Sequence, residues 1–244
     1  MDAKTSTTLI PTTLLDGVRS SLRRLLFQVL SVGPMPHRLG FLSLLTTLKY
    51  CYEMGIQYVS FYGFSIDNFK RRPTEVQILM GLIRDKAEAM SHNSGIVDEL
   101  GVRVEFLGKL DTLDEPTREA IQGVMDATAK NTKMVLLICL AYTSTDEIVH
   151  GVKGAVTEKI DGDASISVED LEKNMYYAGC PDPDILVRTS GETRLSNFLL
   201  WQTTHCLLYC PRCLWPEISL RHLVWGVVQY QRNYQYLEKI KKKM

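Results

Sequence analysis

The sequence predicts an α/β fold with a mainly parallel central sheet flanked by helices. Short apolar runs alternate along the chain with longer segments whose apolar residues recur every three or four positions. The run at residues 134–141 is so uniformly apolar that it fits a parallel strand covered on both faces. Because such alternation builds βαβ units, strands and helices are expected in turn along most of the chain.

Residues 14–30 are expected to form an amphipathic helix. Its apolar stripe would consist of Leu14, Leu15, Val18, Leu22, Leu25, Leu26 and Val29. Arg19, Arg23 and Arg24 lie off that stripe. A basic amphipathic helix can lie on a membrane surface, and a helix packed on the domain is an equal alternative. We therefore treat residues 1–30 as an N-terminal amphipathic helix region and residues 31–244 as one domain.

Short apolar runs predict the strands that follow. They lie at residues 56–64, 102–107, 134–141, 185–187 and 207–209. Between them, Gly55 is a natural helix stop and Pro73 suits the first turn of a helix. Ser144 and Glu147 have the Ser-x-x-Glu spacing of a capping box. Helices are expected at residues 41–55, 73–90 and 116–131, from Ser144, from the pair Ser167 and Asp170, and from Leu220.

Charge and composition exclude several classes of protein. The 28 Lys and Arg residues balance 28 Asp and Glu residues, so nothing in the net charge favours binding of a nucleic acid. The sequence has no apolar run of the ~20 residues that span a bilayer. The pair Cys210 and Cys213 has metal-ligand spacing but lacks a second pair, which makes structural zinc a weak alternative. We expect all six cysteines to be reduced packing residues.

Two polar loops follow predicted strands and are the candidate site. Residues 65–72 follow the strand at 56–64, and residues 188–197 follow the strand at 185–187. Ligands bind beyond the carboxyl ends of parallel strands, and these loops supply guanidinium groups, hydroxyls and a glycine, which suit phosphate oxygens. A solvated loop with ordinary surface arginines is an equal alternative on composition alone. Neither a Walker A motif nor Gly-x-Gly-x-x-Gly is present.

Three blocks resemble the signature motifs of the cis-prenyltransferases, in order and spacing. They are Phe-Ser-Ile-Asp-Asn-Phe-Lys-Arg at residues 64–71, Arg-Thr-Ser-Gly-Glu-Thr-Arg-Leu-Ser-Asn-Phe-Leu-Leu-Trp-Gln at 188–202, and Leu-Trp-Pro-Glu at 214–217. The nearest subgroup is the eukaryotic dehydrodolichyl diphosphate synthase type. The resemblance implies a transferase that condenses isopentenyl diphosphate onto an allylic diphosphate to make polyprenyl diphosphate of the dolichol type, with Mg²⁺ as cofactor.

The resemblance also implies roles for individual residues. Arg188, Arg194 and Ser196 would hold the diphosphate of isopentenyl diphosphate. Ser65 and Asn68 would be catalytic residues in the loop beside the reacting carbons and the allylic pyrophosphate. The remaining substrate-binding residues of these blocks would be Phe64, Phe69 and Arg71, and His37 matches the histidine of a family Gly-His pair and is a candidate catalytic residue.

One family block is missing. The family's first strand leads into His-x-x-x-Ile-Met-Asp-Gly-Asn-x-Arg, whose aspartate is its principal magnesium residue, whereas here Pro36 runs directly into His37. We therefore expect the sheet to lack its first strand, and we assign no metal ligand. Two alternatives stay open: a catalytic subunit whose competence this loss compromises, and a non-catalytic truncated isoform that acts as an interaction subunit.

The resemblance extends to partners and location. The chain ends in Lys239-Ile240-Lys241-Lys242-Lys243-Met244 without the Arg-x-Gly motif of homomeric members. This resembles subunits that need a Nogo-B-receptor-like partner, although a solvated lysine tail is the plain alternative. Peripheral contact with the cytosolic face of the endoplasmic reticulum is expected, with a cytoplasmic location as the alternative.

Overall fold

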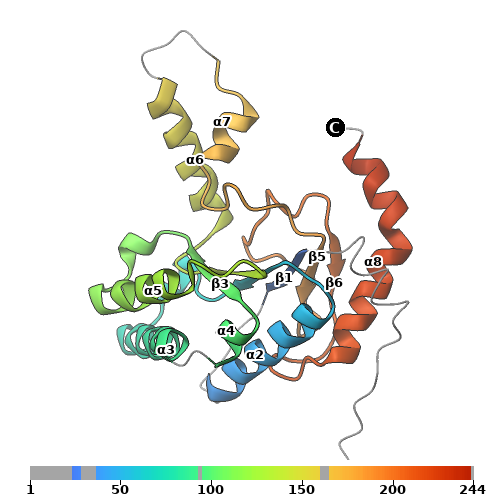
Figure 1. Ribbon diagram of the computed structural model, residues 1–244. Helices are drawn as coiled ribbons and strands as arrows, with labels where there is room; N and C mark the ends of the chain where they lie inside the picture. Colours follow the sequence, from blue (N-terminus) through green and yellow to red (C-terminus); the bar gives the residue numbers. More distant parts are fainter. Residues whose placement is uncertain (1–23, 29–36, 93–94, 160–164, 243–244) are drawn as a thin grey trace, which may run out of the picture.

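The sheet consists of parallel strands in the order β3-β4-β2-β1-β5-β6 (Figure 1). The computed structural model describes residues 24–28, 37–92, 95–159 and 165–242. The strands are β1 Arg24–Gln28, β2 Tyr58–Tyr62, β3 Val102–Leu107, β4 Met134–Cys139, β5 Ile185–Arg188 and β6 Leu207–Tyr209. The predicted α/β class and parallel sheet are confirmed, and the strands predicted at 102–107 and 207–209 have those bounds.

Strand β1 corrects two expectations. Residues 24–28 form a strand rather than part of a helix, and they pair with both β2 and β5, with Leu25 opposite Val59 and Ile185. The position that we expected to be vacant is therefore filled, and the sheet includes residues that lie before the expected domain boundary at residue 30. Residues 14–23 and 29–30 lie outside the described residues. A gap would leave rows of unpaired backbone groups on β2 and β5, and a short apolar run can satisfy them.

An ion pair joins the start of β1 to the start of β5. The guanidinium of Arg24 donates to Asp184, from Nη2 to Oδ1 over 2.6 Å and from Nε to Oδ2 over 3.1 Å. The backbone N–H of Arg24 also donates to Asp184 Oδ2. The side chain of Asp184 is 2 % exposed. Tyr230 in α8 Leu220–Lys241 donates to the same carboxylate. This cluster therefore links β1, β5 and the last long helix.

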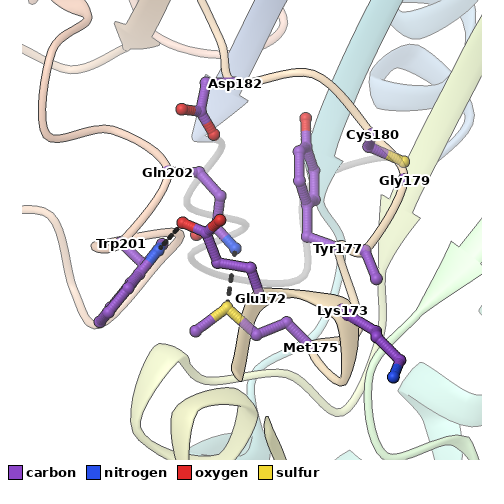
Figure 2. A pocket seen from close by; sticks show the side chains of 10 residues that line it. Glu172, Lys173, Met175, Tyr177, Gly179, Cys180, Asp182, Trp201 and Gln202 are labelled. Carbon is purple, nitrogen blue, oxygen red and sulfur yellow. Dashed lines mark hydrogen bonds between the residues drawn. The ribbon is translucent and has the colours of Figure 1, made fainter. Parts of the chain in front are cut away.

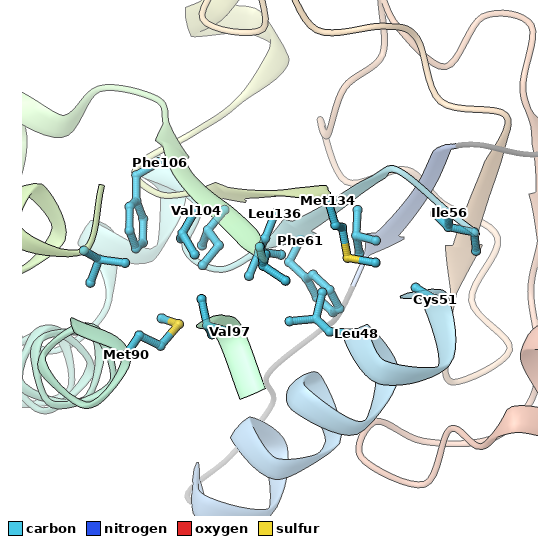
Figure 3. Packing of buried hydrophobic residues seen from close by; sticks show 14 of the residues in the cluster. Leu48, Cys51, Ile56, Phe61, Met90, Val97, Val104, Phe106, Met134 and Leu136 are labelled. Atoms are coloured by element: carbon cyan, nitrogen blue, oxygen red, sulfur yellow. The ribbon is translucent and has the colours of Figure 1, made fainter. Parts of the chain in front are cut away.

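The main hydrophobic core lies between the sheet and the helices on one of its faces. Helices α2 His37–Glu53, α3 Pro73–His92 and α4 Gly95–Glu99 cover this face, and α5 Glu115–Thr128 packs on α3 and β3. Figure 3 shows Leu48 of α2 against Phe61, with Val97 below Val104 and Met90 below Phe106. Leu48, Cys51 and Val104 are fully buried. The apolar faces of these helices thus pack against the central strands.

Two helices, α6 Ser144–Lys159 and α7 Val168–Lys173, project away from the sheet (Figure 1). The short helix predicted to start at Ser167 and Asp170 is confirmed, and these two residues cap each other. The one predicted for α6 is wrong: Ser144 lies inside the helix, and the carboxylate of Glu147 is buried in a network described below. Thr143 Oγ1 instead accepts from the N–H of Asp146. Over the described part of the chain, no helix combines the length and hydropathy needed to cross a membrane.

Candidate active site

The loops after β2, β5 and β6 meet at the carboxyl edge of the sheet. Tyr62, the last residue of β2, stacks on Phe198 of the loop after β5, with ring centroids 4.2 Å apart and an interplanar angle of 6°. The N–H of Ser190 donates to the carbonyl of Cys213 over 2.8 Å, and that of Gly191 to the carbonyl of Pro211 over 2.9 Å. The two loops predicted as the site therefore leave the sheet at the same edge, and the loop after β6 lies beside the loop at residues 188–197.

Ser65 and Asn68 hold the shape of the loop after β2. Ser65 Oγ accepts from the N–H of Asp67 over 3.2 Å, and Asn68 Oδ1 accepts from the N–H of Ser65 over 2.9 Å. Phe64 is 2 % exposed and packs edge-to-face against Phe69, with centroids 4.9 Å apart. Phe64 thus belongs to the hydrophobic core beneath the loop. A 3-10 helix, η1 Ile66–Lys70, results from this local pattern.

Arg71 follows η1 and lies at the start of α3. Its Nη1 is 2.6 Å from Glu75 Oε1, and both side chains are partly exposed. A guanidinium in such a pair can exchange its carboxylate for another anion at small cost, because exposed ion pairs are worth little. The structure therefore places Arg71 at the rim of the candidate site.

Arg188 is the most unusual residue of the site. It ends β5 and is 1 % exposed, yet its Nε and Nη1 atoms have no hydrogen-bond partner within the described parts of the chain. Its Nη2 donates to Ser196 Oγ over 3.4 Å. Burial lowers the pKa of Arg188, and the positive charge of Arg194 lowers this pKa further. Because an unpaired buried cation is costly, this arrangement favours an anion against the free N–H groups.

Arg194 and Ser196 complete the loop after β5. Arg194 is exposed and forms an ion pair with Glu192. Ser196 and the next residue, Asn197, have φ angles of 47° and 56°, in the left-handed region that residues other than glycine rarely adopt. The three residues predicted to bind a diphosphate are thus gathered at one strand end, although Arg194 points to solvent while Arg188 is buried.

A carboxylate cluster for a divalent cation is not found among the residues that the structure describes. Asp67 is paired with Lys70, and Glu192 with Arg194. Gln28, the last residue of β1, is paired in register with Arg188, so the central strand ends in an amide residue. His37 begins α2, and its side chain lies outside the described atoms. What the described loops offer is guanidinium and hydroxyl groups, which suit an anion.

A buried network around Glu147 was not predicted from the sequence. Glu147 is fully buried and accepts hydrogen bonds from Tyr142 Oη, from the N–H of Tyr177 and from Gln202 Nε2. Burial, followed by the negative charge of Glu147, raises the pKa of Tyr142. The role of Glu147 as a buried acceptor was missed because the Ser-x-x-Glu spacing is also the pattern of a capping box.

A polar pocket lies beside this network (Figure 2). Its volume is about 320 Å³, and Tyr177, Gln202 and Trp201 contribute to its wall. Trp201 Nε1 donates to Glu172 Oε1 over 2.9 Å across the pocket. None of the residues predicted for the site lines this pocket, which lies between α7 and the segments at 177–182 and 201–202.

Comparison with known proteins gives a consistent result. Residues 31–237 match the family described as "Putative undecaprenyl diphosphate synthase". The dehydrodolichyl diphosphate synthase CPT3 of Solanum lycopersicum is 44 % identical, over 94 % of this chain and 96 % of its own length. The rubber cis-polyprenyltransferase HRT2 of Hevea brasiliensis is 45 % identical, over 90 % of this chain and 92 % of its own length.

More distant similarities agree. The dehydrodolichyl diphosphate synthase complex subunit of Homo sapiens is 41 % identical, over 83 % of this chain and 62 % of its own length. The crystal structure of a probable undecaprenyl diphosphate synthase from Campylobacter jejuni superimposes with a TM-score of 0.74 and 25 % identity, covering 86 % of this chain and 95 % of the other. Sequence and fold thus converge, and this chain belongs to the cis-prenyltransferase family.

Proposed function

We propose that this chain binds the diphosphate of isopentenyl diphosphate through Arg188, Arg194 and Ser196, as the catalytic-type member of a dolichol-type polyprenyl diphosphate synthase. The observation that carries the proposal is the buried guanidinium of Arg188, whose Nε and Nη1 atoms have no hydrogen-bond partner among the residues that the structure describes. A planar guanidinium can donate two parallel hydrogen bonds to phosphate oxygens. Family membership supplies the substrate class, because cis-prenyltransferases condense isopentenyl diphosphate with an allylic diphosphate.

Arg71, Ser65 and Asn68 are proposed to face the allylic diphosphate, with Phe69 and Phe64 beneath them. Ionisation of an allylic diphosphate leaves negative charge on the departing pyrophosphate, which positive groups stabilise. Arg71 at the loop rim is placed to contribute such a charge. His37, at the amino end of α2, is proposed as a further anion contact, because helix amino termini attract negative charge.

We further propose that the chain as written elongates nothing measurable. The alignment with the Solanum lycopersicum relative extends over 277 residues, which exceeds the 244 residues of this chain. The relative therefore contains residues without a counterpart in this chain, and we propose that they belong at the junction of Pro36 and His37. The family uses Mg²⁺, and the described loops offer no free carboxylate cluster for it. The alternative is a non-catalytic interaction subunit, which would keep the fold and the dimer surface but turn nothing over.

Replacement of Arg188 with Ala tests the proposed diphosphate site. A charge-assisted hydrogen bond contributes roughly 1.5–3 kcal/mol, so the affinity for isopentenyl diphosphate should fall about 10- to 100-fold. Lysine should restore little of this loss because it lacks the planar fork. Arg118→Ala, which removes an exposed arginine paired with Glu115 on α5, is the matched control and should leave affinity unchanged. Isothermal titration calorimetry measures these affinities, and an unaltered affinity in the Arg188→Ala variant would show that the arginine is structural.

A heteromeric partner is proposed because the matching human and mouse proteins are named as complex subunits. Co-expression with a Nogo-B-receptor-like subunit should yield a complex that elutes ahead of the free chain on size exclusion. The Solanum lycopersicum relative, tested in parallel, shows whether the chosen partner is suitable. Recovery of the free chain alone, where that relative forms a complex, would contradict the proposal.

Peripheral attachment to the cytosolic face of the endoplasmic reticulum is proposed through residues 14–23. Leu14, Leu15, Val18 and Leu22 supply apolar area, and Arg19 and Arg23 can face anionic lipid headgroups. Deletion of residues 1–23 leaves β1 intact and should reduce binding to anionic liposomes at least about fivefold, since each basic residue near such a surface contributes about 1 kcal/mol. Unchanged co-sedimentation with liposomes would exclude this segment as the anchor.

A further inference from the structure

The loop that carries Ser196 has a conformation that local sequence does not favour. Ser196, Asn197 and Leu199 have φ angles of 47°, 56° and 42°. Left-handed backbone is costly for residues other than glycine, and two such residues in succession persist only when their surroundings hold them. The contacts that hold this loop therefore decide where the Ser196 hydroxyl lies.

Those contacts come from the first turn of α6, more than fifty residues earlier in the chain. The N–H of Ser144 donates to the carbonyl of Asn197 over 2.8 Å. Both the N–H and the Oγ1 hydroxyl of Thr145 donate to Asn197 Oδ1 over 3.1 Å. In return, Ser144 Oγ accepts from the N–H of Leu200 over 2.9 Å. The free N–H groups that every helix has at its amino end are thus used to fasten this loop.

Both sides of this contact are themselves fixed. The helix side is held by Glu147, one turn along α6, through its buried hydrogen bonds to Tyr177 and Gln202. The loop side is held by Phe198, which is fully buried against Tyr62. Close-packed and hydrogen-bonded groups of this kind leave little freedom for the helix to move relative to the loop.

We infer that the first turn of α6 is a clamp that places Ser196 at Arg188, so that Asn197, Ser144 and Thr145 are positioning residues for the bound diphosphate. The inference rests on the proposed function, since it takes the anion at Arg188 to be that diphosphate. Ser196 directly precedes Asn197, and its Oγ accepts from Arg188 Nη2 over 3.4 Å. When the clamp is released, Ser196 moves away from the guanidinium and the anion loses a hydroxyl contact.

Asn197→Gly separates the clamp from backbone strain. Glycine adopts a φ near 56° readily, but it removes both hydrogen bonds from Thr145. We expect the dissociation constant for isopentenyl diphosphate to rise about five- to tenfold in calorimetry, in line with the loss of one or two hydrogen bonds. Thr145→Val removes the hydroxyl and should also raise the dissociation constant. Thr145→Ser keeps a hydroxyl and should bind isopentenyl diphosphate as the unmodified chain does. Thr157→Val, which removes a comparable hydroxyl farther along α6, should bind normally.

A double-mutant cycle with Ser196→Ala distinguishes positioning from a general effect on the fold. If Asn197 acts through Ser196, Asn197→Gly should cost less than about twofold in affinity once the Ser196 hydroxyl is absent. An equal loss in both backgrounds would overturn the clamp, as would unchanged affinity in Asn197→Gly alone. Failure of the unmodified chain to bind isopentenyl diphosphate would instead overturn the proposed function and the clamp with it, so the two failures are distinguishable.

Discussion

Reinsertion of the missing family segment between Pro36 and His37 is expected to raise isopentenyl diphosphate incorporation by at least about a thousandfold, since ~4 kcal/mol of transition-state stabilisation corresponds to that factor. The segment restores a strand end with an aspartate, and a magnesium ion held there supplies several kcal/mol of charge stabilisation. In the present chain that strand position is taken by residues 24–28, and Gln28 stands beside Arg188 at its carboxyl end. The inserted strand should therefore displace β1 from the sheet.

The control for this experiment is the same insertion with its aspartate replaced by alanine. It should fold as well as the complete insertion and incorporate no label, which separates repair of the sheet from repair of the chemistry. Incorporation of labelled isopentenyl diphosphate is measured with an allylic primer, Mg²⁺ and the partner subunit. A reinserted chain that folds, binds both substrates and stays inactive would show that the missing segment does not explain the loss.

Arg24→Ala is expected to lower the free energy of unfolding by about 3–5 kcal/mol, the usual cost of removing one partner of a buried ion pair. The Asp184 carboxylate, which is 2 % exposed, would lose its two-pronged partner at 2.6 and 3.1 Å. Lys241 Nζ lies 3.9 Å from the same carboxylate and can compensate only in part. The loss loosens the start of β1, the strand that joins the two halves of the sheet.

Urea unfolding followed by circular dichroism at pH 7 measures this change. Arg103→Ala is the matched control, because Arg103 lies on β3 in an exposed pair with Glu105 and should contribute less than about 1 kcal/mol. A loss below about 1 kcal/mol in Arg24→Ala as well would mean that residues 24–28 do not form the central strand in solution.

Most strands were predictable because their apolar runs are consistent with a strand but not with a helix. Residues 102–107 and 134–139 are flanked by turn residues and are too short for helices, so length settled their assignment. Residues 24–28 were predicted as helix because Leu25 and Leu26 also continue a stripe of helical period. These residues form a strand because they pair with the backbone edges of both β2 and β5. Such pairing depends on tertiary structure and cannot be predicted from local sequence.

The candidate site also combines features that local sequence predicts with features that depend on tertiary contacts. Its two loops were predicted because the carboxyl ends of parallel strands share one edge, and Tyr62 at the end of β2 stacks on Phe198, the residue after the second loop. The burial of Arg188 and the contacts of Asn197 with Thr145 depend on residues far apart in the chain, so composition could not reveal them. Glu147 was misread because a buried acceptor and a capping residue share one spacing.

Assay of the unmodified chain tests the central claim most directly. The chain, a Nogo-B-receptor-like subunit, an allylic primer and Mg²⁺ are incubated with labelled isopentenyl diphosphate, and polyprenyl products are separated by chain length. The missing carboxylate segment and the retained Arg188 site predict no product above background from a chain that still binds isopentenyl diphosphate in calorimetry. Labelled polyprenyl diphosphate made by the unmodified chain would contradict this account.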